Sequence, residues 1–251
     1  MIVYKLANHD RTTYGGFLWG PKGWSPPILK GKGKLCTKSW YHGYEDPLLA
    51  ALHGPAHVSF KHPILFAIAV AKADVRRDGQ VKLGFRLGVV QDDVPLPEPT
   101  LEQRVRYGLG AALVVYHEPS YVSWASGWID GQDRSQVAAR RAAEAAWMSE
   151  WIDGQDRSQV AVAVRRGRVA ARRAQVAAQA AAGATWRAAA QASEAALSAA
   201  LSAAEAATAL NLLAIAHWAM STDALNTASL PVWATEAGAA GSREGEGMHT
   251  P

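Results

Sequence analysis

Alanine accounts for 33 of the 87 residues from 134 to 220, and this concentration restricts the fold of that part of the chain more than any other feature. Alanine has the highest helix propensity, and its small side chain lets helices approach closely. The segment WIDGQDRSQVA occurs at residues 128–138 and again at 151–161. In each copy a glycine can end one helix, and an aspartate with a glutamine three residues later can begin the next. We therefore predict packed helices joined at these two segments. Two copies without a third argue against a solenoid.

The first 99 residues have a different composition. They contain all nine lysines and carry 13 basic and 8 acidic residues, a net charge of +5, whereas residues 100–251 carry a net charge of −1 with arginine as the basic residue throughout. Residues 2–6 and 64–70 are typical of strands, the second one apolar on both faces and hence central. Residues 81–89 alternate over nine positions, which predicts a single strand.

Local signals predict two further elements in this part. Residues 12–19, with Gly15 and Gly16, are expected to pair with the first strand through a bend. A short helix is expected after Asp46 as N-cap and Pro47 at its first position, with Gly54 closing it.

These patterns together predict an α+β fold in four parts. We expect a small α+β domain at 1–99, connecting helices at 100–132, the alanine-rich helical region at 133–222 and a loose tail at 223–251, disordered from about residue 236. No apolar run of about 18 residues predicts a membrane span, and the N-terminus lacks the pattern of a secretion signal. With one cysteine and no internal disulfide, we expect a location in the cytoplasm of a host cell or in a virion.

Residues 35–57, LCTKSWYHGYEDPLLAALHGPAH, resemble an uncharacterised domain of phage and prophage proteins. The matching positions are Leu35, Cys36, Trp40, His42, Pro47 and Leu48, with flanking matches at Tyr4, Lys5, Gly15, Gly16 and Phe17. Many members have Gly-Phe-His-x-Cys where this chain has residues 40–44, so the role of a second cysteine does not carry over. The resemblance covers about residues 1–95 and implies a phage origin, without a reaction or cofactor.

The same patch contains the candidate catalytic residues. Cys36 and His42 could form a nucleophile–base pair, with Arg11 as a third member of the site. The alternative is a buried thiol beside an aromatic core. The order of elements also faintly resembles compact mono-ADP-ribosyltransferase domains, but those place a key glutamate late in the sheet, where residues 81–90 contain no acid.

Metal and phosphate sites receive less support. His53 and His57 have the four-residue spacing that places two ligands on one helical face. Gly54 and Pro55 lie between them, however, and should end the helix. The segment GKGK lacks the serine or threonine and the helix of a phosphate-binding loop. We therefore predict no metal and no cofactor.

A run of 37 residues without an acid, 157–193, carries a predicted interaction face. If it is one helix, seven arginines fall on one half of its circumference, and the valines repeat every seven residues within that half. Its members are Arg157, Arg165, Arg166, Arg168, Arg172, Arg173, Arg187, Val162, Val169 and Val176. Alanines such as Ala170 and Ala174 occupy the other half. Such a face suits a protein partner or self-association better than nucleic acid. The function predicted is a non-enzymatic accessory or interaction protein of the phage type, the alternative being a small enzyme.

Overall fold

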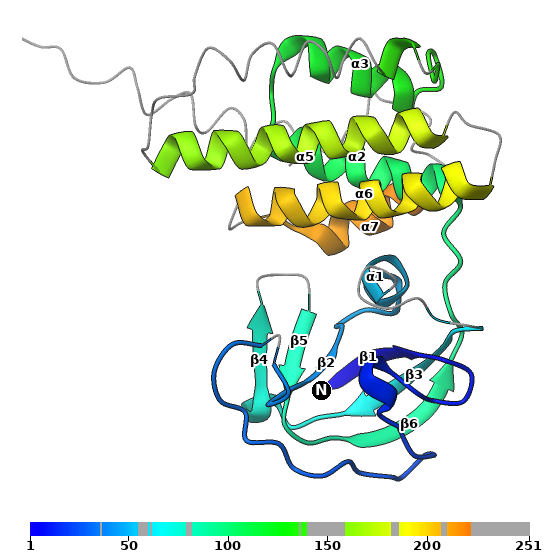
Figure 1. The fold of residues 1–251 in the computed structure, drawn as a ribbon, viewed down its shortest axis with the longest axis vertical. Coiled ribbons are helices and arrows are strands. Elements are labelled where there is room, and N and C mark those ends of the chain that lie inside the picture. Colours follow the sequence, from blue (N-terminus) through cyan, green and yellow to red (C-terminus); the bar gives the residue numbers. More distant parts are fainter. Residues whose placement is uncertain are drawn as a thin grey trace, which may run out of the picture. The chain divides into compact units, whose positions relative to one another are not determined.

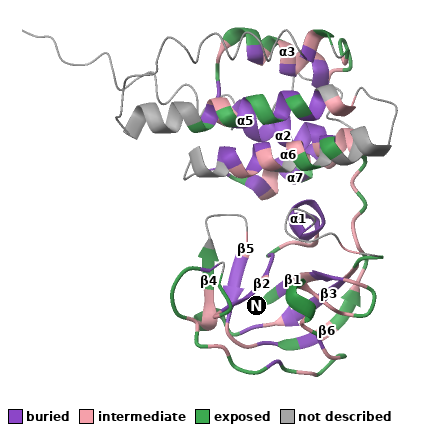
Figure 2. Cartoon of the chain, viewed as in Figure 1, coloured by how far each residue is buried: buried purple, intermediate pink, exposed green. Residues whose placement is uncertain are grey.

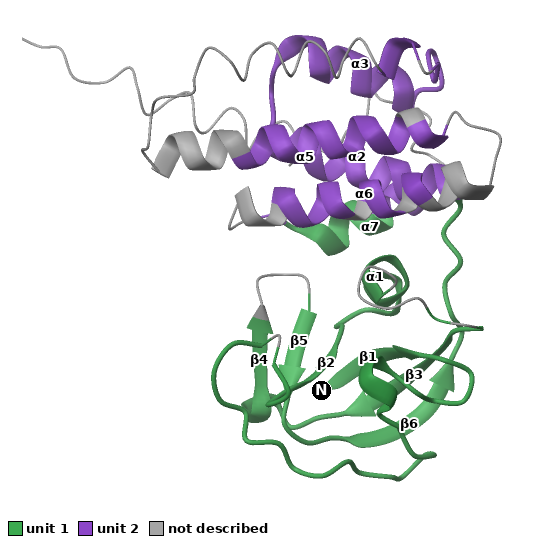
Figure 3. Cartoon of the chain, in the orientation of Figure 1, with its two compact units in different colours: residues 1–100, 211–217 green, residues 101–210, 218–251 purple. Residues whose placement is uncertain are grey.

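A computed structural model of the chain describes residues 1–35, 37–54, 60, 62–78, 82–135, 137–139, 159–181, 186–206 and 210–221. The chain divides into two compact units (Figure 3). Unit 1 comprises residues 1–100 and 211–217, and unit 2 comprises residues 101–210 and 218–251. Strands occupy the first part of the chain and helices the second, which confirms the α+β fold. The predicted tail and residues 151–158 of the second duplicated segment lie outside the described residues.

The first sheet of unit 1 is antiparallel and consists of β1 (Ile2–Ala7), β3 (Ile64–Ala69) and β6 (Val89–Val94), in the order β1-β3-β6 (Figure 1). β3 lies at its centre, as its unbroken apolar sequence predicts. Four consecutive residues of β3, Leu65 to Ile68, are buried. In the register of β1 against β3, Lys5 lies opposite Phe66.

The second sheet consists of β2 (Tyr41–Gly43), β5 (Lys82–Phe85) and β4 (Val75–Asp78), in the order β2-β5-β4, with the 3-10 turn η3 (Lys72–Asp74) before β4. A two-bond bridge links the two sheets: the amide of Tyr4 donates to the carbonyl of Tyr44 at 2.8 Å, and the amide of Tyr44 donates back at 2.9 Å. The aromatic core lies between the sheets and includes Trp19, Tyr41, Phe66 and Phe85.

The prediction of one strand over residues 81–89 is wrong, because the chain changes sheets in the middle of it. Nε of Arg86 donates to the carbonyl of Leu29 at 3.1 Å, which diverts the backbone after β5. Gly88 then passes so close to β3 that a Cβ atom would lie 2.5 Å from Cγ2 of Ile68. The alternating pattern is therefore shared by two strands in different sheets.

The prediction that residues 12–19 pair with β1 is also wrong. Gly15 and Gly16 have φ angles of 73° and 74°, a left-handed conformation that glycine adopts without steric cost, and form the 3-10 turn η1 (Tyr14–Gly16). Thr12 consequently pairs with Leu18 in an isolated bridge. The loop folds back on itself, and Trp19, which follows Leu18, lies in the core, where it is 2% exposed.

Helix α1 (Pro47–His53) forms where its capping signals predict. Oδ1 of Asp46 accepts a hydrogen bond from the amide of Leu48 at 2.7 Å, and Pro47 occupies the first helical position. At the other end, a Cβ atom on Gly54 would lie 2.6 Å from a methyl carbon of Leu6. Gly54 keeps a right-handed helical conformation, with φ −54° and ψ −46°, so it does not end α1 by a left-handed turn as the prediction implied, but it lets the end of α1 lie close to β1.

Unit 2 is built on three closely packed helices, α2 (Leu101–Val115), α5 (Gln159–Ala181) and α6 (Trp186–Ala206), together with α3 (Pro119–Ile129) (Figure 1). The buried residues of α5 and α6 are mainly alanines, whereas α2 also buries large side chains such as Tyr107 and Leu109, and Figure 2 shows the buried stretch along α2. A Cβ atom on Gly108 would lie 2.8 Å from the backbone of Ala196, and one on Gly167 would lie 2.5 Å from the carbonyl oxygen of Val115. These glycines let α2 approach both α6 and α5.

The last helix, α7 (Leu212–Met220), follows α6 and is divided between the two units after His217. Nε2 of His217 lies 3.6 Å from a carboxylate oxygen of Asp46, within unit 1. No helix within the described ranges combines the length and the apolar character needed to cross a membrane.

The first duplicated segment forms the predicted joint between helices. α3 ends at Ile129, and Gly131 has a φ angle of 75°. Oδ1 of Asp133 then accepts from the amide of Ser135 at 2.9 Å, as an N-cap does, and residues 137–139 are helical.

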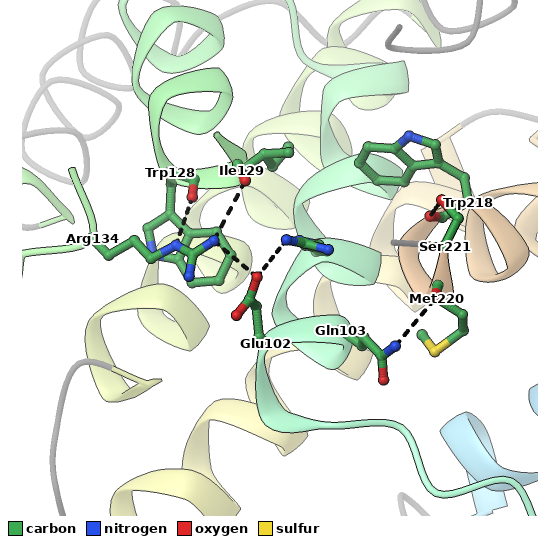
Figure 4. Close-up of polar contacts among 9 residues, drawn as sticks. Glu102, Gln103, Trp128, Ile129, Arg134, Trp218, Met220 and Ser221 are labelled. Carbon is green, nitrogen blue, oxygen red and sulfur yellow. Dashed lines mark hydrogen bonds and ion pairs between the residues drawn. The ribbon is translucent and has the colours of Figure 1, made fainter. Parts of the chain in front are cut away.

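Arg134 secures this joint, a role that the sequence analysis did not identify. Its Nε donates to the carbonyl of Trp128 at 3.0 Å, and its Nη2 donates to Glu102 of α2 at 2.9 Å (Figure 4). The guanidinium carbon lies 4.9 Å from the centre of the Trp128 ring. Glu102 also accepts from Arg106, one turn along α2. The carboxylate of Glu102 thus holds one arginine of its own helix, and through Arg134 it ties α2 to the end of α3.

Candidate functional site

A cavity of about 620 Å³ opens in unit 1 and is the candidate site. Its walls are mainly aromatic and come from the loop after β1, from the approach to β2, from β2 and its end, and from the segment before β3: Tyr14, Phe17, Trp19, Trp40, Tyr41, Tyr44 and Phe60. Trp19 holds this wall in place, because its ring packs against those of Phe17 and Tyr41 at 5.3 Å and against Phe66 at 5.7 Å between centroids. Cavities of 300–1,000 Å³ with apolar walls are typical of small-molecule sites.

Lys5 reaches this cavity from the middle of β1. Alternate residues of a strand share a face, so Lys5 lies on the same face as Val3 and Ala7, both 0% exposed members of the core. Its Nζ lies 5.9 Å from the centre of the Trp19 ring. Burial, and secondarily the charge of Lys82, lowers the pKa of Lys5 from 10.5 to about 8. A lysine in an otherwise apolar strand, in step with buried residues, was a signal that the sequence analysis passed over.

The polar groups of the cavity are cationic or neutral. Lys5, Lys38, Lys82 and His42 line it, together with the hydroxyl-bearing Thr13 and Thr37. Among the described residues of its lining, none is an aspartate or a glutamate. Charges inside a partly desolvated cavity act more strongly than in water. The site therefore attracts anions, while its rings offer flat apolar surface.

The structure places the three candidate catalytic residues differently. His42 lines the cavity, and its Nε2 donates to the carbonyl of Leu35, so only Nδ1 could serve as a base. Arg11 is not among the lining residues; it pairs with Asp93 and donates to the carbonyl of Gly20 at 3.3 Å. Cys36 lies outside the described residues. The structure thus brings His42, but not Arg11, to the cavity.

Of the two histidines considered as metal ligands, the structure describes only His53. His53 is 0% exposed on α1, and its ring lies 6.3 Å from that of Tyr44. His57 lies outside the described residues. Among the residues that the structure covers, no group of three or more histidine, cysteine, aspartate or glutamate side chains is placed to hold a metal ion.

The predicted interaction face falls on α5, with one correction. α5 ends at Ala181 and α6 begins at Trp186, so Arg187 belongs to another helix and not to this face. Val169 and Val176 are 41% and 46% exposed, whereas Ala170, Ala174 and Ala178 on the opposite side are fully buried. Arg166, Arg172 and Arg173 are exposed and Arg168 is half-buried.

Three members of the face were named from sequence alone and remain predictions. Arg157 lies outside the described residues, and the structure gives no side-chain environment for Val162 and Arg165. Arg173 already has a role within unit 2, since its Nη1 donates to the hydroxyl of Ser202 on α6 at 2.6 Å.

Comparisons with protein-family models, with curated proteins and with solved structures gave no match to this chain. The resemblance to a phage domain therefore stays a prediction, and the functional argument depends on the site itself.

Proposed function

We propose that unit 1 binds a small organic anion that carries a planar ring, such as a nucleoside monophosphate. The observation that carries this proposal is the combination, in one cavity of about 620 Å³, of seven aromatic side chains and three lysines without a carboxylate among the described lining residues. Aromatic faces favour stacking on a flat ring, and ammonium groups at one site favour phosphate or carboxylate. A neutral or cationic ligand would leave the lysines uncompensated.

Calorimetric titration with three matched probes tests the proposal. Adenosine 5′-monophosphate supplies ring and anion, adenosine supplies the ring alone, and ribose 5-phosphate supplies the anion alone. We expect the monophosphate to bind on the order of tenfold more tightly than either partial ligand, with an affinity that falls as salt is added. Equal affinities for the monophosphate and adenosine would contradict the anionic part of the proposal.

A pair of lysine variants locates the binding. Lys82→Gln should reduce monophosphate binding toward the level of adenosine and leave adenosine unchanged. Lys22→Gln is the matched control, because Lys22 is exposed, pairs with Asp92 at 2.7 Å and is not among the cavity-lining residues. If both variants weaken binding equally, the anion does not occupy this cavity.

We propose a second function for unit 2, association with an acidic helix of a partner protein. Two large apolar side chains, Val169 and Val176, are exposed seven residues apart on α5, with Arg166 and Arg172 beside them. This arrangement complements an apolar seam flanked by glutamates, as in a coiled coil. In this role the chain would be a non-enzymatic accessory protein, of the phage type that its residues 35–57 resemble.

Two helical peptides test this second proposal. Each carries a row of leucines along one face, flanked by glutamates in one peptide and by lysines in the other. The glutamate peptide should bind, and Val169→Ser with Val176→Ser should abolish binding; the lysine peptide should not bind. Failure of the glutamate peptide would refute the proposal. If sedimentation velocity instead shows a concentration-dependent dimer, this face binds a second copy of the chain and not a different protein. If the chain binds random duplex DNA with an affinity that falls steeply as salt is added, this face binds the phosphates of nucleic acid and not a protein helix.

A further inference from the structure

We propose that Lys5 is a covalent site: its amine forms a reversible imine with an aldehyde or ketone carried by a ring-bearing anion in the aromatic cavity. This inference rests on the proposed ligand pocket and goes one step further, from binding to a bond.

The position of the side chain is the first argument. Lys5 extends from the core-facing side of β1, between the buried Val3 and Ala7, so that its amine enters the cavity beside the Trp19 ring at 5.9 Å. The apolar surroundings and the neighbouring Lys82 both disfavour a second positive charge there. A lysine desolvated in an apolar pocket or placed next to another cation is the form in which lysine acts as a nucleophile.

The protonation state is the second argument. A lysine with a pKa of about 8 is roughly one-tenth neutral at pH 7, whereas a lysine at 10.5 is neutral in about 3 molecules in 10,000. The gain in neutral amine is therefore on the order of 300-fold. Weaker bases are also weaker nucleophiles, and this offsets part of the gain. A net advantage of about tenfold over an exposed lysine follows.

The chemical step needs no oxidant, reductant or metal. The lone pair of Nζ attacks the carbonyl carbon, the π pair of the carbonyl moves to oxygen, and proton transfer gives a carbinolamine. The nitrogen lone pair then expels the oxygen as water, with a proton taken from solvent, and the resulting iminium returns its N–H proton to solvent. The product is an imine, and hydrolysis reverses every bond change.

Pyridoxal 5′-phosphate is the probe, because it joins a planar ring, a phosphate and an aldehyde. The full chain is incubated with it at pH 7, reduced with borohydride, which delivers hydride to the imine carbon, and digested for peptide mass spectrometry. We expect Lys5 to be modified about tenfold faster than the exposed Lys22, with a rate that rises from pH 6 to about pH 8 and then levels off. Modification of Lys38 or Lys82 in preference to Lys5 would overturn the inference.

Pyridoxine 5′-phosphate separates this inference from the proposal beneath it, because its alcohol cannot form an imine. If this alcohol binds and the aldehyde leaves no reduced adduct on Lys5, the covalent site is refuted and the pocket stands. If the alcohol does not bind and no adduct forms, both are refuted. Lys5→Arg should lose the adduct, because its guanidinium stays protonated and does not form the imine. Should that variant fail to fold, the mapped adduct in the unaltered chain still decides the question.

Discussion

Replacing Gly167 with alanine should destabilise unit 2, although the same change stabilises most helices. In a helix interior alanine is favoured over glycine by about 1 kcal/mol. At Gly167 the new Cβ would lie 2.5 Å from the carbonyl oxygen of Val115 on α2 and 3.3 Å from its carbonyl carbon. Backbone atoms cannot rotate away, so α5 must move off α2, and overpacking of this kind costs about 1–3 kcal/mol. After the propensity gain of about 1 kcal/mol is subtracted, we expect a net loss of up to about 2 kcal/mol in the free energy of unfolding.

Urea unfolding followed by circular dichroism at 222 nm measures this change, since unit 2 contains most of the helix. Gly127→Ala is the matched control: Gly127 is also helical, in α3, but the nearest atom to an added Cβ, Oε1 of Gln132, is 3.9 Å away. That variant should gain about 0.5–1 kcal/mol from helix propensity alone. If Gly167→Ala stabilises the protein as much as Gly127→Ala does, the close approach of α5 to α2 is not a packing constraint, and the argument fails.

Three further predictions concern single side chains. Asp46→Ala should lower the free energy of unfolding of unit 1 by about 1 kcal/mol, because α1 loses its N-cap. Asp46→Asn should keep most of this stability, because asparagine also accepts the capping hydrogen bond. Equal losses for the two variants in urea titrations would contradict the capping role of Asp46. Arg134→Lys should lower the free energy of unfolding of unit 2 by about 1–2 kcal/mol, because lysine keeps the charge but cannot hold the Trp128 carbonyl and Glu102 together. An unfolding midpoint unchanged by this variant would refute the role of Arg134 in joining α2 to the end of α3. The lowered pKa of Lys5 means that the unfolded chain binds this proton more tightly, so this group should make unit 1 more stable as pH rises from about 8 to 10.5, with its penalty fully present below pH 8. Lys5→Met should remove that rise, and an identical pH profile in the variant would count against it.

The elements that the sequence predicted correctly are those with local causes. Asp46 and Pro47 lie within one turn of the helix they begin, and Gly131 and Asp133 lie within the joint they form. Such signals depend on neighbouring residues alone. The apolar run of β3 also indicated its central place, because burial on both faces leaves its mark on every residue of the strand.

The errors arose where distant residues decide the structure. Nothing between residues 81 and 89 shows that Gly88 must pass within van der Waals contact of Ile68, or that Arg86 will bond to the carbonyl of Leu29. The change of sheet follows from these long-range contacts. The candidate site shares this origin, since its walls come from segments as far apart as Lys5 and Lys82. The sequence identified His42 as a candidate residue of this cavity but not the other lining residues, because no short motif contains those residues together.

The division of basic residues, lysine in the first part of the chain and arginine thereafter, has a physical counterpart in the structure. Arg134 uses two nitrogens of its planar fork to join a carbonyl to a carboxylate, and Nη1 of Arg173 donates to both a carbonyl and a hydroxyl of α6. Arg86 does the same in unit 1, between Leu29 and Asp74. Lysine has a single nitrogen and cannot donate from two nitrogens held in a fixed plane, and arginine cannot release its proton near neutral pH. A cavity that needs an amine able to lose its charge therefore requires lysine, and helix joints that need several fixed donors require arginine. Arg134→Lys and Lys5→Arg exchange the two residues in opposite directions, so each should remove the property that its site depends on while leaving the net charge of the chain near neutral pH almost unchanged.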